Sequence, residues 1–326
     1  MFCHLSTLAR VGIIAALSLS TACTKSDEQP DVASAVDPKM DSLVSAEWLS
    51  EHLNDPDLVV LDCTVMVEQD EDGGFRTVNG RGNYEAGHIP TAAFADLMGD
   101  LADGDSPHEF AMPSPQQFVA AMEALGVGDD ARVVLYDANN SVWAARVWWM
   151  LRWIGFDQAA LLDGGLGAWT AEDRPLSTEP SNRPAGTLTV ALRPQLIADR
   201  DEVLASIEDG SAHLLDSLPA GHYRGEWTMY DRPGHIPGAS NVSTTLTVDD
   251  TGRYRSPEEL AEVFQGDREV RTITYCGGGI AASSNAFLMT RLGFTDVAVY
   301  TASLQEWTAD PGLPLEVAPE LADFGD

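Results

Sequence analysis

Lysine is almost absent from this chain of 326 residues, which contains only Lys25 and Lys39. Beyond residue 39 the permanent positive charge is therefore carried by arginine alone. Acidic residues number 51 against 19 basic ones, and the formal net charge is −32. A surface of that charge repels phosphate backbones, so we do not expect a nucleic acid as partner. We interpret the excess of acid as a solvated surface.

Cysteine is also scarce, with four in the chain. Cys3 and Cys23 lie in the first 23 residues, which leaves Cys63 and Cys276 for the folded body. Two cysteines do not make a disulfide framework, and no Cys-x-x-Cys pair or Cys/His cluster indicates a metal site. We therefore expect no metal and no cofactor. A disulfide between Cys63 and Cys276 is conceivable in an oxidising compartment, but Cys63 fits a small buried side chain better than a resolving thiol.

The N-terminal apolar run is too short to span a bilayer. It extends from Val11 to Leu19, follows Arg10 and precedes small residues, as in a signal peptide. A small residue directly before Cys23 resembles a bacterial lipoprotein cleavage site, although position −3 holds Ser20 where leucine is usual. The resemblance implies that residues 1–23 are a signal peptide and that Cys23 is lipidated. The protein would then be anchored to a membrane in the periplasm or cell envelope. An ordinary cleaved signal and an uncleaved anchor are the alternatives.

The chain repeats itself. The spacing from Asp137 to Trp169 is 32 residues, and that from Cys276 to Trp307 is 31. Agreement in order and spacing indicates a duplicated domain. The matching segments are 87–90 and 234–237 (both Gly-His-Ile-Pro), 133–137 and 272–276, 152–156 and 290–294, and 166–169 and 304–307. We expect a polar tether at 24–42, an N-terminal domain at 43–175, a linker at 176–195 and a C-terminal domain at 196–320.

Each copy alternates apolar runs with amphipathic stretches. The apolar runs ending at Asp62 and Asp216 are typical of buried strands that lead into loops. Ser114-Pro115 and Ser256-Pro257 are typical of helix starts, with serine as N-cap and proline in the first turn. Alternating strands and helices predict two α/β domains, each a parallel sheet flanked by helices.

The loop around Cys276 carries the chemistry. A strand over 272–275 is expected to end at Cys276, and a helix is expected to follow the three glycines. Successive glycines let several backbone N–H groups converge, and the helix adds its partly positive N-terminus. A cysteine there is expected to have a depressed pKa and to act as a nucleophilic thiolate. The alternative is an inert buried thiol. The loop residues expected to cradle a bound anion are Gly277, Gly278, Gly279, Ile280 and Ala281.

This strand, loop and helix resemble the active loop of the rhodanese family. Cys-Gly-Gly-Gly-Ile-Ala is similar to the six-residue loop of thiosulfate and 3-mercaptopyruvate sulfurtransferases, and the Gly-His-Ile-Pro segments extend the resemblance over both halves. It implies that Cys276 takes sulfane sulfur from an anionic donor, becomes a persulfide, and passes the sulfur to cyanide, a thiol or thioredoxin. Asp137 stands where the N-terminal half would have a nucleophile, so only the C-terminal half is expected to be catalytic. A phosphatase of this fold would need an arginine closing a longer loop, and Ala282 stands near that position.

The resemblance also implies arginine ligands for the donor. Arg224 matches a family position that binds the donor's carboxylate, and Arg232 matches a second such position approximately, because the spacing is shorter. Each could instead form a surface ion pair. The serine that 3-mercaptopyruvate enzymes place in the loop is Gly278 here, and the basic residues of thiosulfate enzymes are absent, so the donor stays open between these two compounds.

The sequence also allows two functions other than that of an enzyme. One is a persulfide carrier or redox sensor without fast turnover, and another is a binding domain in which Cys276 is incidental. His88 and His235 occur in both halves, including the one without a nucleophile, which favours a structural role in the turn. Asp62 and Asp216 are expected to cap loop amides rather than to take part in catalysis.

Overall fold

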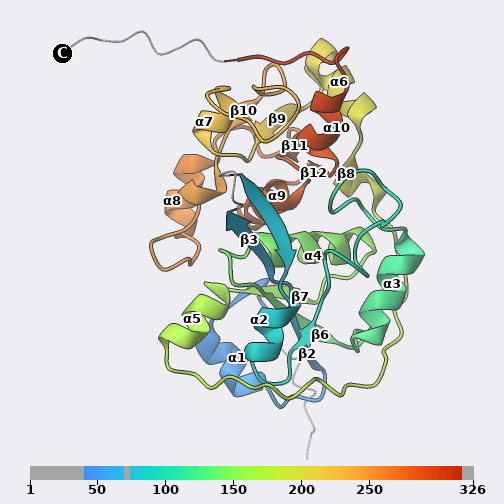
Figure 1. The fold of residues 1–326 in the computed structure, drawn as a ribbon, viewed down its shortest axis with the longest axis vertical. Helices are drawn as coiled ribbons and strands as arrows, with labels where there is room; N and C mark the ends of the chain where they lie inside the picture. The colour runs from blue at the N-terminus through green and yellow to red at the C-terminus, as the bar shows by residue number, and fades with distance from the viewer. Residues whose placement is uncertain (1–39, 70–73, 318–326) are drawn as a thin grey trace, which may run out of the picture. The chain divides into compact units, whose positions relative to one another are not determined.

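The computed structural model describes residues 40–69 and 74–317. The first part of it is an α/β domain built on a parallel sheet with the strand order β1-β7-β6-β2-β5. Figure 1 shows helices α1 to α5 around this sheet. Its strands are β1 (Leu43–Val44), β2 (Leu58–Asp62), β5 (Ala93–Phe94), β6 (Arg132–Tyr136) and β7 (Ala159–Leu162). Its helices are α1 (Ala46–His52), α2 (Arg81–Ala86), α3 (Pro115–Ala124), α4 (Val142–Trp153) and α5 (Gly165–Ala171). A separate antiparallel hairpin joins β3 (Val65–Gln69) to β4 (Phe75–Asn79).

The second part repeats this topology. Its parallel sheet has the order β10-β9-β11-β12-β8, so each strand occupies the place of its counterpart in the first sheet. The strands are β8 (Ile197–Ala198), β9 (His213–Asp216), β10 (Ser240–Asn241), β11 (Thr272–Tyr275) and β12 (Val297–Tyr300). The helices are α6 (Arg200–Asp209), α7 (Ala220–Tyr223), α8 (Pro257–Val263), α9 (Ile280–Arg291) and α10 (Ser303–Ala309), with 3-10 turns η1 (Pro194–Leu196) and η2 (Thr244–Leu246). The prediction of two α/β domains with parallel sheets is confirmed.

Local sequence signals account for several of these boundaries. The Ser114 hydroxyl accepts a hydrogen bond from the Gln117 N–H at the start of α3. At the start of α8, Ser256 and Glu259 form a reciprocal capping box. Both helices begin with proline, whose missing N–H has no helical partner at that position. The two helix starts predicted from Ser-Pro are therefore confirmed.

Both faces of the N-terminal sheet are buried. Along β2, Val59 and Leu61 belong to one apolar cluster, while Leu58 and Val60 belong to another on the opposite face. Side chains alternate along a strand, so a continuous apolar run means that helices cover both faces. The first of these clusters continues into the second domain and includes Ile273 of β11. One apolar core therefore links the two sheets.

Helices α4 and α9 form the centre of the contact between the domains. Each has nine buried residues, and a helix that is buried all round must have neighbours on every side. Trp148 of α4 meets Phe287 of α9 edge to face, with ring centroids 4.8 Å apart. Within the described residues no helix is long and apolar enough to cross a bilayer.

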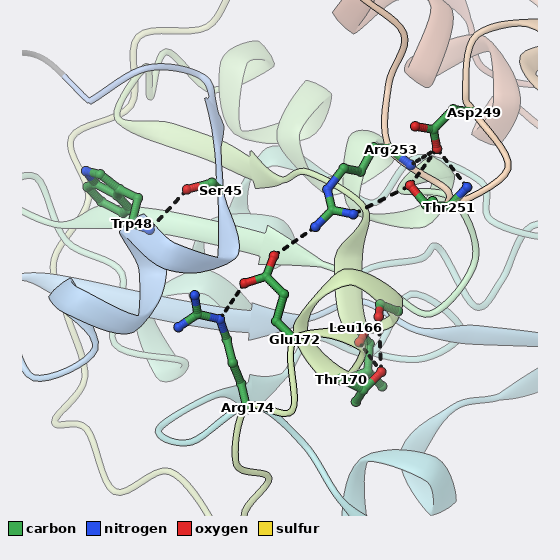
Figure 2. Close-up of polar contacts among 10 residues, drawn as sticks. Ser45, Trp48, Leu166, Thr170, Glu172, Arg174, Asp249, Thr251 and Arg253 are labelled. Carbon is green, nitrogen blue, oxygen red and sulfur yellow. Dashed lines mark hydrogen bonds and ion pairs between the residues drawn. The ribbon is translucent and has the colours of Figure 1, made fainter.

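A polar contact adds to this apolar one. Figure 2 shows the Glu172 carboxylate between Arg174 and Arg253, at 2.8 Å from each guanidinium. Arg253 belongs to a turn of the second domain that Asp249 holds by accepting from the N–H groups of Thr251 and Arg253. Glu172 directly follows α5 of the first domain, so this ion pair joins the two domains at the surface.

The repeated histidines have structural partners in both halves. His88 donates from Nδ1 to the Tyr84 carbonyl at 2.7 Å and stacks on the Tyr84 ring. His235 donates from Nδ1 to the Tyr223 carbonyl, also at 2.7 Å, and stacks on Tyr223. The same contacts in a half with and a half without a loop cysteine support the structural role predicted for them.

Candidate active site

Cys276 is the first residue after β11, an interior strand of the C-terminal sheet. Its side chain lies at the carboxyl end of the sheet, where open α/β folds bind ligands, and the residue is only 2% exposed. The loop ends at Gly279, whose φ of 81° places it in the left-handed region, and α9 begins at the next residue. The predicted strand, glycine loop and helix are all present.

Three hydrogen bonds hold the Cys276 loop against the start of α10. The Cys276 N–H donates to the Ser303 hydroxyl at 3.0 Å. The N–H groups of Leu304 and Gln305 donate to the carbonyls of Cys276 and Gly277, at 3.1 and 3.0 Å. Ser303 adopts a φ of 53° to make this contact, which is strained for a residue with a Cβ. Ser303 therefore fixes the backbone of the nucleophile.

The loop glycines also provide room for side chains from elsewhere. A Cβ on Gly277 would lie 1.5 Å from the Tyr230 hydroxyl, and one on Gly278 would lie 2.2 Å from Nε2 of Gln305. Any larger side chain at these positions would have to displace Tyr230 or Gln305. The pKa of Tyr230 is raised by burial and, further, by negative charge at Cys276. Tyr230 and Gln305 thus cover the loop directly.

The equivalent loop of the N-terminal domain shows how an anion sits in such a cradle. Asp137, the first residue after β6, accepts four backbone N–H groups on its carboxylate. Burial raises the pKa of Asp137, and these donors oppose the rise. The donors are Asn139 (2.6 Å), Ser141 (3.0 Å), Trp143 (2.9 Å) and Ala144 (2.9 Å).

The same register can be transferred to the second domain. Helix α4 begins at Val142 and α9 at Ile280, so the N–H groups of Ala281 and Ala282 correspond to those that bind Asp137 from the helix. By this correspondence the amide cradle expected around Cys276 is the counterpart of one that holds a carboxylate, with a loop one residue shorter between strand and helix. Such a cradle stabilises an anionic sulfur or the anionic group of a donor.

Arg224 lies at the C-terminal end of α7, and its side chain is about one-third exposed. Its Nε donates to the Glu226 carboxylate at 2.5 Å. The surface ion pair considered from the sequence is thus present. A role for Arg224 in binding the donor stays a prediction, and it requires that the guanidinium leave Glu226.

Arg232 binds backbone carbonyls in this structure, and a role in binding the donor stays a prediction. Its guanidinium donates to four backbone carbonyls around the end of α10, at 2.7–3.0 Å. These contacts use nearly all of its donors and anchor the chain that follows α10, so the geometry favours a structural role. The acceptors are the carbonyls of Trp307, Thr308, Asp310 and Leu313.

A segment of the N-terminal domain closes over the site. The Glu109 N–H donates to Oε1 of Gln305 at 2.8 Å, and Nε2 of Gln305 donates back to the Glu109 carbonyl at 3.3 Å. No sequence signal pointed to Tyr230, Ser303, Gln305 or Glu109, because they reach the loop only through tertiary packing. Cys63 is fully buried, burial raises its pKa well above that of a free thiol, and neither Cys63 nor Cys276 is in a disulfide.

Comparison with known proteins agrees with this architecture. The family model described as "Rhodanese-like domain" matches residues 45–172 and 199–310. The 3-mercaptopyruvate sulfurtransferase of Escherichia coli is 33% identical over 284 residues, which cover 84% of this chain and 97% of that protein. The sulfur carrier protein TtuD of Thermus thermophilus is 34% identical over 296 residues, covering 85% of this chain and 97% of TtuD. The crystal structure of SseA from Escherichia coli superposes with a TM-score of 0.72 at 32% identity, covering 80% of this chain and 98% of SseA.

The duplicated parallel sheets and the strand, loop and helix at Cys276 define a tandem-domain α/β protein of the rhodanese type. The chain belongs to the rhodanese family. Its relatives over most of its length include 3-mercaptopyruvate and thiosulfate sulfurtransferases, and the chain is a sulfurtransferase.

Proposed function

We propose that Cys276 carries sulfane sulfur as a persulfide from a small anionic donor to a thiophilic acceptor. The supporting observation is that Cys276 occupies the position at which the Asp137 carboxylate binds four amides in the other domain. A negatively charged sulfur at Cys276 would meet the corresponding amides of the loop and of the N-terminus of α9. The donors considered are 3-mercaptopyruvate and thiosulfate, and the acceptors are cyanide, a thiol or thioredoxin.

The reaction divides into two displacements at sulfur. The Cys276 thiolate attacks the transferable sulfur of the donor and forms a sulfur–sulfur bond. The bond that breaks is the S–S bond of thiosulfate, which leaves as sulfite, or the C–S bond of 3-mercaptopyruvate, whose enolate takes up a proton and leaves as pyruvate. The acceptor then attacks the outer sulfur, which regenerates the thiolate and yields thiocyanate or a new persulfide. The loop amides face negative charge in both steps, so one fixed cradle serves both.

We propose 3-mercaptopyruvate as the better donor. Gly277 and Gly278 pack under Tyr230 and Gln305, which leaves the loop without a basic side chain for a sulfonate. A donor carboxylate would instead be bound from outside the loop, for which Arg224 is the proposed ligand. The Escherichia coli relative is named for 3-mercaptopyruvate, which supports the same choice.

Steady-state kinetics with both donors test this proposal. We expect kcat/KM for 3-mercaptopyruvate to exceed that for thiosulfate, with cyanide as acceptor, and Cys276→Ser to be inactive with both. Cys63→Ala serves as a matched control, because its thiol is buried outside the loop. A parent enzyme that forms neither thiocyanate nor pyruvate would refute the enzymatic function, and a preference for thiosulfate would refute the choice of donor.

A second candidate function is sulfur carriage to a protein acceptor. It is favoured by the near-complete burial of Cys276 beneath the Glu109–Gln305 contact and by the relative named as a sulfur carrier. In that case a persulfide at Cys276 would be stable and turnover with small acceptors slow. Intact-mass measurement after one equivalent of donor distinguishes the two, because a carrier keeps one added sulfur atom in the presence of cyanide.

We also propose that the protein is exported and anchored through a lipid on Cys23. The signal peptide pattern at 1–23 and Cys23 itself lie outside the described residues, so the support is the sequence pattern alone. Incorporation of a radiolabelled fatty acid in the native host, lost in Cys23→Ala, is the expected result. Absence of label in the parent protein would exclude the lipid anchor.

A further inference from the structure

Arg146 is a fully buried arginine in the N-terminal domain. It lies on α4, the helix that packs against α9 of the catalytic domain, and it is 1% exposed. Arginine is almost never buried to this extent without a charged partner. The contacts of this side chain therefore call for an explanation.

The guanidinium has few partners of its own. Nη2 donates to the Phe110 carbonyl at 2.9 Å, while Nε and Nη1 have no hydrogen-bond partner among the described residues. No ion pair to a carboxylate is formed by Arg146 in that part of the chain. Burial lowers its pKa to about 10, and a negative charge at Cys276 acts in the opposite direction. The side chain thus stays protonated at neutral pH, with two unused donors.

Those donors lie against the catalytic loop. A Cβ on Gly279 would be 2.9 Å from Nη1 of Arg146, so the guanidinium touches the loop at the residue that caps α9. Gly279 is required here for two reasons: its φ is left-handed, and a side chain would collide with Arg146 and with the Thr301 carbonyl. A positive charge from one domain therefore adjoins the amide cradle of the other.

The duplication provides an internal control for this arrangement. From the starts of α4 and α9, the counterpart of Arg146 is Ser284 on α9. The Ser284 hydroxyl pairs with the Tyr254 hydroxyl at 3.0 Å and brings no charge. The loop with a built-in carboxylate, Asp137, thus has a neutral counterpart to Arg146, whereas the loop with a thiol has the cation.

We propose that Arg146 is the counter-charge for the anionic sulfur at Cys276, supplied across the domain contact by the domain that lacks a nucleophile. In the resting enzyme it would stabilise the thiolate. In the enzyme that carries a persulfide it would stabilise the outer sulfur. This second role rests on the proposed function. Arg146 acts as a positioning and electrostatic residue, because its guanidinium has no carboxylate partner among the described residues and its Nε and Nη1 donors are left for an anion.

The test measures alkylation of Cys276 by iodoacetamide as a function of pH, in the whole protein without any donor. Mass spectrometry of the digested protein reports Cys276 separately from Cys63. Arg146→Gln and Arg146→Met remove the charge, and Arg146→Lys keeps it. Arg152→Gln is the matched control, since Arg152 lies on the same helix, half-buried against Trp148, with Asp157 as its partner.

We expect both neutral variants to move the alkylation midpoint to higher pH and to slow the reaction at pH 7 by about tenfold or more. Arg146→Lys should retain most of the parent rate, and Arg152→Gln all of it. A folded neutral variant whose pH profile matches that of the parent would overturn the proposal, because a purely structural role changes stability and not this profile. Should neither neutral variant fold, a tenfold loss in Arg146→Lys would overturn it.

The same variants separate this proposal from the proposed function. Alkylation requires no sulfur donor, so it reports on Arg146 even if neither donor is turned over. With turnover established, single-turnover loading followed by decay of the persulfide tests the second half of the proposal. We expect the persulfide of Arg146→Gln to decay about tenfold faster than that of Arg152→Gln, and equal decay rates would restrict Arg146 to the thiolate.

Discussion

The loops after β6 and β11 occupy the same place in two copies of one fold, yet they treat negative charge in opposite ways. In the first, the Asp137 carboxylate is part of the chain and uses the amides permanently. In the second, Cys276 brings no carboxylate, so the amides can bind an anionic sulfur when one is present. The first loop therefore resembles the second loop with an anion permanently bound. The fold provides the cradle, and the residue that follows the central strand decides whether a carboxylate fills it.

The largest effect is expected from making the second loop resemble the first. Cys276→Asp should abolish sulfur transfer, with kcat/KM at least about a thousandfold below the parent, because the nucleophile is lost and the cradle is filled. Cys276→Ser removes the nucleophile without adding charge. If the comparison is correct, Cys276→Asp should be the more stable of these two variants in urea unfolding at pH 8. A Cys276→Asp protein less stable than Cys276→Ser would show that the second loop does not bind a carboxylate.

The reverse change tests the first loop. Asp137→Ala removes the acceptor of four buried N–H groups, and we expect it to lower the free energy of unfolding by about 3 kcal/mol. Asp137→Asn keeps one acceptor oxygen and should cost less. Asp130→Asn is the control, an exposed acid in the turn before β6 that should change stability little. Urea unfolding that showed Asp137→Ala as stable as Asp130→Asn would contradict the assigned role.

Asp216 ends β9 and Asp62 ends β2, so the pH dependence of stability can be compared between the two domains at equivalent positions. Burial raises the pKa of Asp216 to about 7, only partly opposed by the Leu218 N–H. Because the folded-state pKa lies above the unfolded one, the stability that Asp216 contributes is fully present below about pH 4 and is lost as pH rises to 7. Asp216→Asn should remove this loss, so the variant should gain about 4 kcal/mol on the parent between pH 4 and 8.

Urea unfolding of Asp216→Asn and parent at several pH values provides the measurement. The matched variant is Asp62→Asn, since Asp62 ends β2, accepts the Thr64 N–H, and also has a pKa raised by burial. A difference between Asp216→Asn and the parent that stays constant from pH 4 to 8 would show that Asp216 does not titrate in this range. Equal behaviour of both variants would mean that the two copies share this property.

The sequence predicted the features that depend on neighbours along the chain. Two α/β domains with parallel sheets were predicted from the apolar runs, the Ser-Pro helix starts and the repeat. The glycines after Cys276 predicted a loop that a helix follows. It did not predict the partners that tertiary packing brings to the loop. Tyr230 and Arg146 are 46 and 130 positions from Cys276, and neither lies in a motif with a known chemical meaning.

The assignment of Arg232 shows a further limit of spacing arguments. Its position before Gly-His-Ile-Pro suggested a substrate ligand, but a guanidinium has five donors and satisfies backbone carbonyls equally well. Which of the two occurs depends on whether carbonyls lie within reach, and the end of α10 places four of them there. The sequence identifies the guanidinium, and the fold determines which hydrogen-bond acceptors lie within its reach.

The smallest and most specific effect concerns the residues that start α10 and α5. Ser303 and Gly165 have nearly the same φ, 53° and 54°, and in each domain the next N–H donates to the carbonyl of the residue after the central strand. Serine is strained at this φ, so Ser303→Gly should relieve roughly 1 kcal/mol of backbone strain while removing the acceptor of the Cys276 N–H. Ser303→Ala keeps the strain and also loses the acceptor.

We therefore expect both variants to lower kcat, by about fivefold, and only Ser303→Gly to keep the thermal stability of the parent. KM for the donor should change little, because the Ser303 hydroxyl contacts the Cys276 N–H and the Tyr300 carbonyl. If Ser303→Gly retained full kcat, the Ser303 hydroxyl would have no part in positioning Cys276. The difference between the two domains at this position would then be one of backbone strain alone.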